Sequence, residues 1–148
     1  MSNGVKQALP MPHYYRLDEQ IGYILRQVSQ RHTTLFSSMI GDGLKPRQWA
    51  VLARLHEIGT ASQADLGRAV AMDAATVKGT VERLERRGLA RRVRDPEDGR
   101  KLLVTLTPTG RRVTLRNMDR AIAITRETVA PLSADESRQL VRLLGRLR

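Results

Sequence analysis

The sequence predicts a mostly helical fold that carries one small two-stranded β-hairpin. Over most of its 148 residues, apolar side chains recur at steps of three and four, which is the period of an amphipathic helix. One stretch, 89–106, instead alternates apolar and polar residues around the turn sequence DPEDG, as a hairpin does. The length suits one domain, so we expect residues 1–148 to form a single unit.

The first third of the sequence predicts an arm followed by two helices. Residues 1–13 are polar and contain two prolines, which favours a loose arm that becomes ordered only when something holds it. A long helix is predicted over 17–39, with glycines after it as the stop. Pro46 predicts the first turn of a second helix, and Gly59 its end. The apolar stripe of the first helix is Leu17, Ile21, Ile24, Leu25, Val28, Leu35, Phe36 and Met39, and the residues expected to face inward on the second are Val51, Leu52, Leu55 and Ile58. A monomer of this length would struggle to cover the first stripe, so a dimer interface is expected there.

Two helix starts follow in quick succession within 62–88, which is the pattern of a helix-turn-helix. Ser62 has an aspartate three residues later, and Asp73 can accept a hydrogen bond from the amide three residues on, so each can cap a helix. The second helix is predicted over 74–87, with Gly88 as its stop. Its inward stripe is Val77, Val81 and Leu84, and the side chains expected off that stripe are Thr76, Lys78, Thr80, Arg83 and Arg87.

The remainder predicts a hairpin and two more helices. Strands over 89–94 and 100–106 would make the wing of a winged helix. The Thr-Pro pair at 107–108 predicts the start of a helix that runs to about residue 129, and Ser133 with Glu136 predicts the capping box of a last helix. The residues expected to face inward in the hairpin are Leu102, Val104 and Leu106.

The charge balance favours a polyanionic partner. Lys and Arg number 26 against 15 Asp and Glu, a formal net charge of +11. Aromatic residues make up only 3% of the chain, too few for stacking platforms that hold single strands, so double-stranded DNA is the expected polyanion. Residues 60–112 hold 12 basic and 7 acidic residues, net +5, which leaves 14 basic and 8 acidic elsewhere, so positive charge is not confined to the helix-turn-helix and wing.

Several kinds of chemistry are not expected. The chain has no cysteine, which excludes disulfides, zinc-thiolate sites and thiol-based redox sensing. Three scattered histidines without paired carboxylates are a weak metal signal, and no nucleophile-base pair or phosphate-binding glycine loop stands out. We therefore expect no enzymatic activity, no cofactor and no metal. Without a signal-peptide core or a run of about 18 apolar residues, a cytoplasmic protein with no membrane partner is expected.

A helix-turn-helix reads DNA by placing its second helix in the major groove. Lys78 is the candidate for hydrogen bonds to guanine, and Gly79 lets the backbone approach the duplex. At the wing tip, Arg100 suits a narrow minor groove, and Asp98 two residues earlier could hold its guanidinium. The alternative for the second helix is a basic surface helix that does not read DNA, and the alternative for the DPEDG segment is a solvated turn. The full set of predicted DNA contacts is Ser62, Gln63, Ala74, Thr76, Lys78, Gly79, Thr80, Arg83, Arg87, Arg92, Asp98, Arg100 and Lys101.

The order and spacing of these elements resemble the MarR (multiple antibiotic resistance regulator) family. The resemblance rests on LKPRQWAVLARL at 44–55, SQADLGRAVAMDAATVKGTVERLERRGL at 62–89 and DPEDGRKLLVTLTPTG at 95–110, and covers roughly residues 14–148. It implies an all-α winged helix-turn-helix in which the segments 14–43 and 111–148 form a homodimer and 44–110 binds DNA. Two departures are Gly99, where relatives often have arginine, and Lys45, where many have a capping Thr or Ser.

The resemblance also implies an effector pocket where the dimer helices meet the DNA-binding lobe. The candidates there are Tyr23, Arg31, His32, Trp49 and His56, a set that suits a small anionic aromatic effector such as a phenolic acid or its thioester. His32 also fits a packed, hydrogen-bonded core position. The expected function is a homodimeric repressor of a neighbouring operon, bound to a pseudo-palindromic operator and released by that effector. The alternatives are a constitutive repressor without a ligand and a winged-helix module that binds protein.

Overall fold

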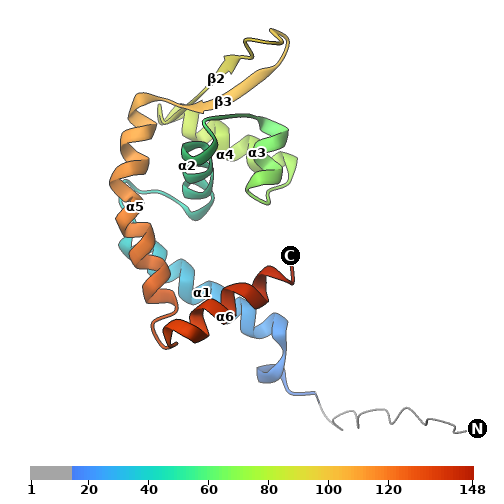
Figure 1. Cartoon of the computed structure of the whole chain (residues 1–148), viewed down its shortest axis with the longest axis vertical. Coiled ribbons are helices and arrows are strands. Elements are labelled where there is room, and N and C mark those ends of the chain that lie inside the picture. Colours follow the sequence, from blue (N-terminus) through green and yellow to red (C-terminus); the bar gives the residue numbers. More distant parts are fainter. Residues whose placement is uncertain (1–14) are drawn as a thin grey trace, which may run out of the picture.

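The computed structural model describes residues 15–148, so the predicted arm over 1–13 lies outside the described residues. Within these described residues, six α-helices and three strands follow one another (Figure 1). After a 3-10 turn, Leu17–Glu19, the helices are α1 (Ile21–Met39), α2 (Pro46–Ile58), α3 (Gln63–Ala69), α4 (Ala74–Arg86), α5 (Pro108–Thr128) and α6 (Ala134–Gly145). The strands are β1 (Thr60–Ser62), β2 (Ala90–Arg94) and β3 (Leu102–Leu106).

The molecule has two parts joined by α5. One end of α5 adjoins the hairpin and the lobe of α2, α3 and α4, whereas its other end lies with α1 and α6 (Figure 1). Helix α1 packs against α5, and α5 also packs against α2. The long helix therefore connects the predicted DNA-binding lobe to the predicted dimerisation helices.

The sheet has three strands rather than the two predicted. It is antiparallel in the order β1-β3-β2, with Arg92 opposite Val104 and Thr60 opposite Thr105. Strand β1 has only three residues, too short to leave an alternating pattern in the sequence. The prediction that Leu102 faces inward is wrong: it is 52% exposed, whereas Val104 and Leu106 are buried.

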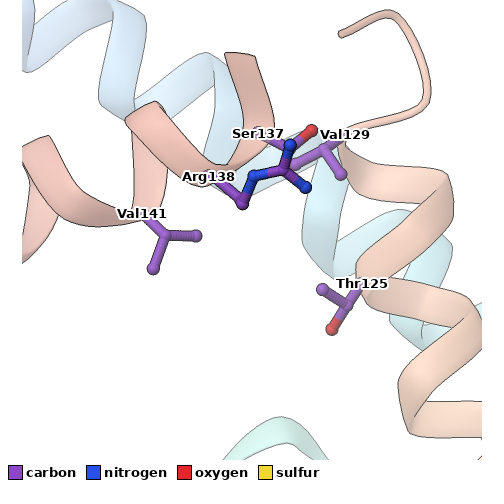
Figure 2. Close-up of a pocket in the computed structure, with 5 residues that line it drawn as sticks. All are labelled: Thr125, Val129, Ser137, Arg138 and Val141. Carbon is purple, nitrogen blue, oxygen red and sulfur yellow. The ribbon is translucent and has the colours of Figure 1, made fainter. Parts of the chain in front are cut away.

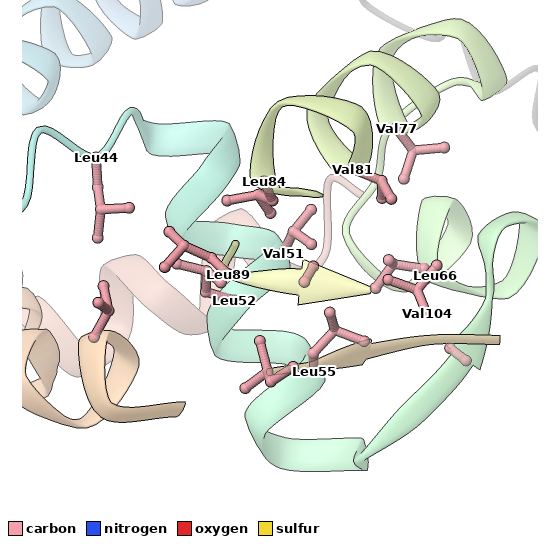
Figure 3. Packing of buried hydrophobic residues seen from close by; sticks show 14 residues of the cluster. Leu44, Val51, Leu52, Leu55, Leu66, Val77, Val81, Leu84, Leu89 and Val104 are labelled. Atoms are coloured by element: carbon pink, nitrogen blue, oxygen red, sulfur yellow. The ribbon is translucent and has the colours of Figure 1, made fainter. Parts of the chain in front are cut away.

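One hydrophobic cluster holds the lobe together (Figure 3). Val51, Leu52 and Leu55 of α2 meet Leu84 of α4 and Val104 of β3 in this cluster. Each of these side chains is at most 1% exposed, and burying such a side chain contributes about 1.5–3 kcal/mol relative to leaving it in water. Ile58, predicted to face inward, is 46% exposed because it is the last residue of α2 and lies beyond the cluster.

Apart from the start of α1, the predicted helix starts and stops are confirmed to within one or two residues. The hydroxyl of Ser62 accepts the amide of Asp65 at 3.1 Å, and the carboxylate of Asp73 accepts the amide of Thr76 at 2.7 Å. The hydroxyl of Thr107 caps α5, and Ser133 with Glu136 forms a capping box on α6. Gly59 and Gly88 follow α2 and α4 with φ of 83° and 67°, a conformation that glycine adopts without strain.

The apolar stripes of the terminal helices are largely uncovered. Phe36 is the only buried residue of α1, which begins at Ile21 rather than Leu17, and α6 has no buried residue. The stripe over the N-terminal half of α1 is uncovered within one chain, where Ile21 is 66% exposed, as predicted for a face that forms a dimer interface. The other exposed apolar residues of the first turn and α1 are Leu17, Ile24, Leu25 and Val28. Among residues 15–148, no helix has the length and apolar character needed to cross a membrane.

Candidate nucleic-acid interface

Helices α3 and α4 form a tight helix-turn-helix. The amide of Met72 donates to the carbonyl of Gly67 at 2.9 Å, which closes the turn between the helices. A Cβ on Gly67 would lie only 3.1 Å from the Met72 carbonyl oxygen and from the Val77 Cγ1 atom, so the two helix backbones approach closely there. Val77 and Val81 then fix α4 on the lobe core. The packing leaves the opposite face of α4 free.

The open face of α4 carries most of the predicted base contacts. Ala74, Lys78 and Arg83 are exposed, and Thr76 and Gly79 are half-buried. The prediction for Thr80 is wrong: its side chain is 2% exposed, and its hydroxyl donates to the carbonyl of Thr76 at 2.8 Å. Lys78 is thus the cation at the centre of the open face.

Two carboxylates at the wing tip accept hydrogen bonds from backbone amides of the same turn. The carboxylate of Asp98 accepts the backbone amide of Arg100 at 3.2 Å, and that of Asp95 accepts the amide of Glu97 at 2.8 Å. The expectation that Asp98 holds the Arg100 guanidinium is therefore wrong. Arg94 folds back to donate to the carbonyl of Gly99 at 2.8 Å. The exposed Arg100 side chain makes no ion pair within residues 15–148, and Lys101 next to it is exposed as well.

Arg92 bonds two helices to the wing instead of extending into solvent. Its guanidinium lies 3.1 Å from the carboxylate of Glu85 on α4 and donates to the amide oxygen of Gln63 on α3 at 3.0 Å. The side chains of Arg92 and Glu85 are 30% and 29% exposed. Two predicted DNA contacts, Gln63 and Arg92, are therefore bonded to each other, and Arg92 sets the position of β2 relative to the helix-turn-helix. The predicted contact Ser62 is half-buried and donates its hydroxyl to the Asp65 carboxylate.

Arg87 has a similar structural role at the end of α4. Its guanidinium donates to the carbonyl of Asp42 and to the amide oxygen of Gln48 at 3.4 Å. These contacts join the end of the reading helix to the loop between α1 and α2. Arg87, a predicted DNA contact, is therefore already hydrogen-bonded within the protein.

A polar network that sequence reasoning missed continues from Asp42 to α5. The Asp42 carboxylate accepts two hydrogen bonds from Arg116, at 2.5 and 3.2 Å, and one from Asn117 at 2.6 Å. Asn117 is fully buried and its amide oxygen accepts the amide of Gly41 at 2.7 Å. The hydrogen bond from Arg116 is the main cause that lowers the pKa of Asp42. The one sequence signal was an asparagine at helical spacing from Val113 and Ile124 within a predicted helix.

The five candidate effector residues do not converge within one chain. Arg31 donates to the carbonyl of Glu127 at 2.7 Å, and the His32 ring lies 2.9 Å from the hydroxyl of Thr128, so both are bonded to the end of α5. His32 is half-buried, as the packed-histidine alternative predicted. Tyr23 lies under the guanidinium of Arg26 at 5.7 Å. Trp49 packs on the lobe core, and His56 is exposed in the last turn of α2.

Comparison with known proteins identifies the family. The MarR family model matches residues 44–102. The HTH-type transcriptional repressor NicR of Pseudomonas putida is 37% identical over 134 residues, which cover 90% of this chain and 85% of NicR. A crystal structure of a probable transcriptional regulator from Pseudomonas aeruginosa is 54% identical, with a TM-score of 0.87 over 90% of this chain and 100% of the other. A structure of BpsR from Bordetella bronchiseptica, whose DNA binding is regulated by 6-hydroxynicotinic acid, is 40% identical with a TM-score of 0.86, over 90% and 96% of the two chains. The protein therefore belongs to the MarR family and is a winged-helix transcriptional regulator.

Proposed function

We propose that this regulator is a homodimeric repressor that binds a pseudo-palindromic operator near the genes it controls and is released by a small aromatic acid. The observation that carries the DNA-binding part is the open face of α4 beside the projecting hairpin (Figure 1). Lys78 on that face and Arg100 at the wing tip are exposed, and neither has an ion-pair partner within residues 15–148. Two such units in a dimer would read half-sites about 10 bp apart.

Footprinting on the intergenic DNA beside its own gene tests this function. We expect one protected site with two-fold symmetry, and binding that weakens steeply as salt rises. A protein-interaction module would instead show no preference for that DNA over a random duplex, and that result would refute the proposed function.

The uncovered helices support the homodimer. Ile21 and Val28 on α1 and Val141 and Leu147 at the C-terminal end are each 46–74% exposed, which is unusual for apolar side chains that line up on helices. A cavity of about 310 Å³ also lies between the end of α5 and α6, with Val129 and Val141 on its walls (Figure 2). We infer that the helices of a partner subunit cover these faces.

Removing residues 133–148 tests the assembly. The truncated chain should be monomeric or aggregate, and it should lose operator binding because the two reading helices are no longer held at a fixed spacing. The full chain at the same concentration is the control. A truncated chain that sediments as a folded monomer and binds the full operator would contradict the proposed interface.

The proposed effector is argued from three candidate residues on α1 and from the similarity to BpsR. Arg31 supplies a cation, and Tyr23 and His32 supply aromatic rings, which suits a flat carboxylate. BpsR, which responds to 6-hydroxynicotinic acid, extends the candidates to hydroxylated heteroaromatic acids. A ligand that binds the released form a hundredfold more tightly would shift the equilibrium by about 2.7 kcal/mol.

Titration of the operator complex with 6-hydroxynicotinate, salicylate, benzoate and hydroxycinnamate tests the effector. We expect at least one acid to release the DNA, and His32→Ala and Trp49→Ala to reduce that response. Thr128→Val is the matched control, because it removes the hydrogen bond to His32 at 2.9 Å but keeps the imidazole. If none of these acids lowers DNA affinity, the aromatic-acid effector is refuted and a constitutive repressor is favoured. If both alanine variants respond as wild type does, the effector site lies elsewhere.

A further inference from the structure

A basic cavity lies along the flank of α4, and two of its cations were not predicted from the sequence to contact DNA. It has a volume of about 550 Å³ and opens between α1, the first turn of α2 and α4. Its charged lining residues are Lys45, Arg47 and Arg83, and its polar ones are Thr33, Gln48 and Thr80. No carboxylate lines it.

Within residues 15–148, no carboxylate lies within ion-pair distance of the three cations of this cavity. The six ion pairs within residues 15–148 include none of them. Arg54, on the same helix as Arg47, is paired with Glu57 at 2.6 Å. Like charges that line one cavity repel one another, and an anion that enters among them relieves that repulsion.

The cavity adjoins the part of α4 that would enter the major groove. Arg47 is close enough to Asp73, the cap of α4, for its charge to act on that carboxylate. Arg83 folds back along α4, with its Nη1 atom 3.4 Å from the position that a Cβ on Gly79 would occupy. The cavity therefore adjoins the second and third turns of the reading helix, where Thr80 and Arg83 line it. A helix in the major groove has a phosphate backbone on each side, and this cavity lies along one side of α4.

We propose that this cavity binds a backbone phosphate of the operator, with Lys45 and Arg47 as contacts that position α4 in the groove. The proposal rests on the proposed DNA-binding function. A phosphodiester carries one negative charge and needs no base-specific partner, so these contacts should add affinity to every sequence alike. A small free anion, such as inorganic phosphate or a carboxylate, shares this chemistry and is the competing occupant.

The test is the salt dependence of DNA affinity in Lys45→Gln, Arg47→Gln and the double variant. The homodimer would carry one such cavity in each subunit, so the double variant should lose two phosphate contacts per operator, which reduces the slope of log affinity against log salt by about 1.8. Each single variant should reduce the slope by less. The loss of affinity in the double variant should then be about 12-fold larger at 50 mM than at 200 mM salt. Operator and random duplexes should show the same change. Arg54→Gln is the matched control, because it removes one charge from the same helix outside this cavity.

The outcomes separate this inference from the proposed function. Wild-type protein that binds no DNA would refute the function itself. Wild-type binding with slopes in the double variant equal to those of Arg54→Gln would overturn the phosphate contact and leave the function intact. Unchanged DNA slopes together with a lost response to added phosphate or benzoate would assign the cavity to a small anion, and would also overturn the inference. Both substituted side chains are exposed, so the thermal unfolding of the variants should match that of wild type.

Discussion

Substitution of Asn117 by alanine should destabilise the junction between α5 and the DNA-binding lobe. Asn117 is fully buried, and its side chain makes hydrogen bonds of 2.6, 2.7 and 2.9 Å to Asp42, Gly41 and Val113. Alanine leaves the amide of Gly41 without this acceptor and removes a charge-assisted bond to Asp42, at a cost of about 1–3 kcal/mol for each group. The higher helix propensity of alanine offsets about 0.5 kcal/mol of this cost. The expected loss of unfolding free energy is about 3 kcal/mol.

Urea unfolding followed by circular dichroism at one fixed protein concentration measures this loss. The concentration must be constant because dimerisation contributes to the apparent stability. A loss of about 3 kcal/mol corresponds to a melting temperature lower by roughly 6–12 °C for a domain of this size. Asp119→Ala, on the exposed face of the same helix, should stay within about 0.5 kcal/mol of wild type. A loss below about 1 kcal/mol in Asn117→Ala would show that the network does not hold the junction.

Three further predictions follow from other contacts. Because hydrogen bonding from Arg116 lowers the pKa of Asp42 below its ordinary value, the stabilising contribution of this carboxylate should be complete above about pH 5 and be lost as pH falls through the lowered pKa. Asp42→Asn should weaken this acid dependence, and equal acid unfolding curves would disprove the role. A Cβ on Gly110 would overlap the carbonyl of Leu89, a backbone atom with little freedom to move, so Gly110→Ala should cost about 2–4 kcal/mol, whereas an unchanged melting temperature would contradict this contact. Arg92→Ala and Glu85→Gln should each cost about 1–2 kcal/mol and couple by about 1 kcal/mol in a double-mutant cycle, and strict additivity would show that the ion pair has no energetic role.

Local signals in the sequence were sufficient for the helix boundaries other than the start of α1. A cap such as Asp73 to the amide of Thr76 involves residues three apart, so both partners are visible in a short window. Thr80 was misassigned although the signal was present. It lies three residues after Val77 and four before Leu84, within the same stripe, and its polar side chain was taken as a sign of exposure.

Contacts between distant segments could not be predicted in this way. Asp42 and Asn117 are 75 residues apart, and Arg92 and Gln63 are 29 apart, so no periodicity links them. Arginines such as Arg92 are compatible with both a phosphate contact and an internal bond, and only the fold distinguishes the two. The same holds for the basic cavity, because its cations come from different helices.

The central claim is that α4 and the wing tip read the operator together. Binding of wild type, Lys78→Ala and Arg100→Ala to operator and random duplexes at one salt concentration tests it directly. We predict that each variant loses about 1–3 kcal/mol of binding free energy on the operator and less on random DNA. The reason is that each removed side chain would contact base edges, which differ between the duplexes, and would also supply a positive charge, which acts on both. If both variants bind the operator as tightly as wild type does, or lose the same affinity on both duplexes, then neither the open face of α4 nor the wing tip reads the sequence.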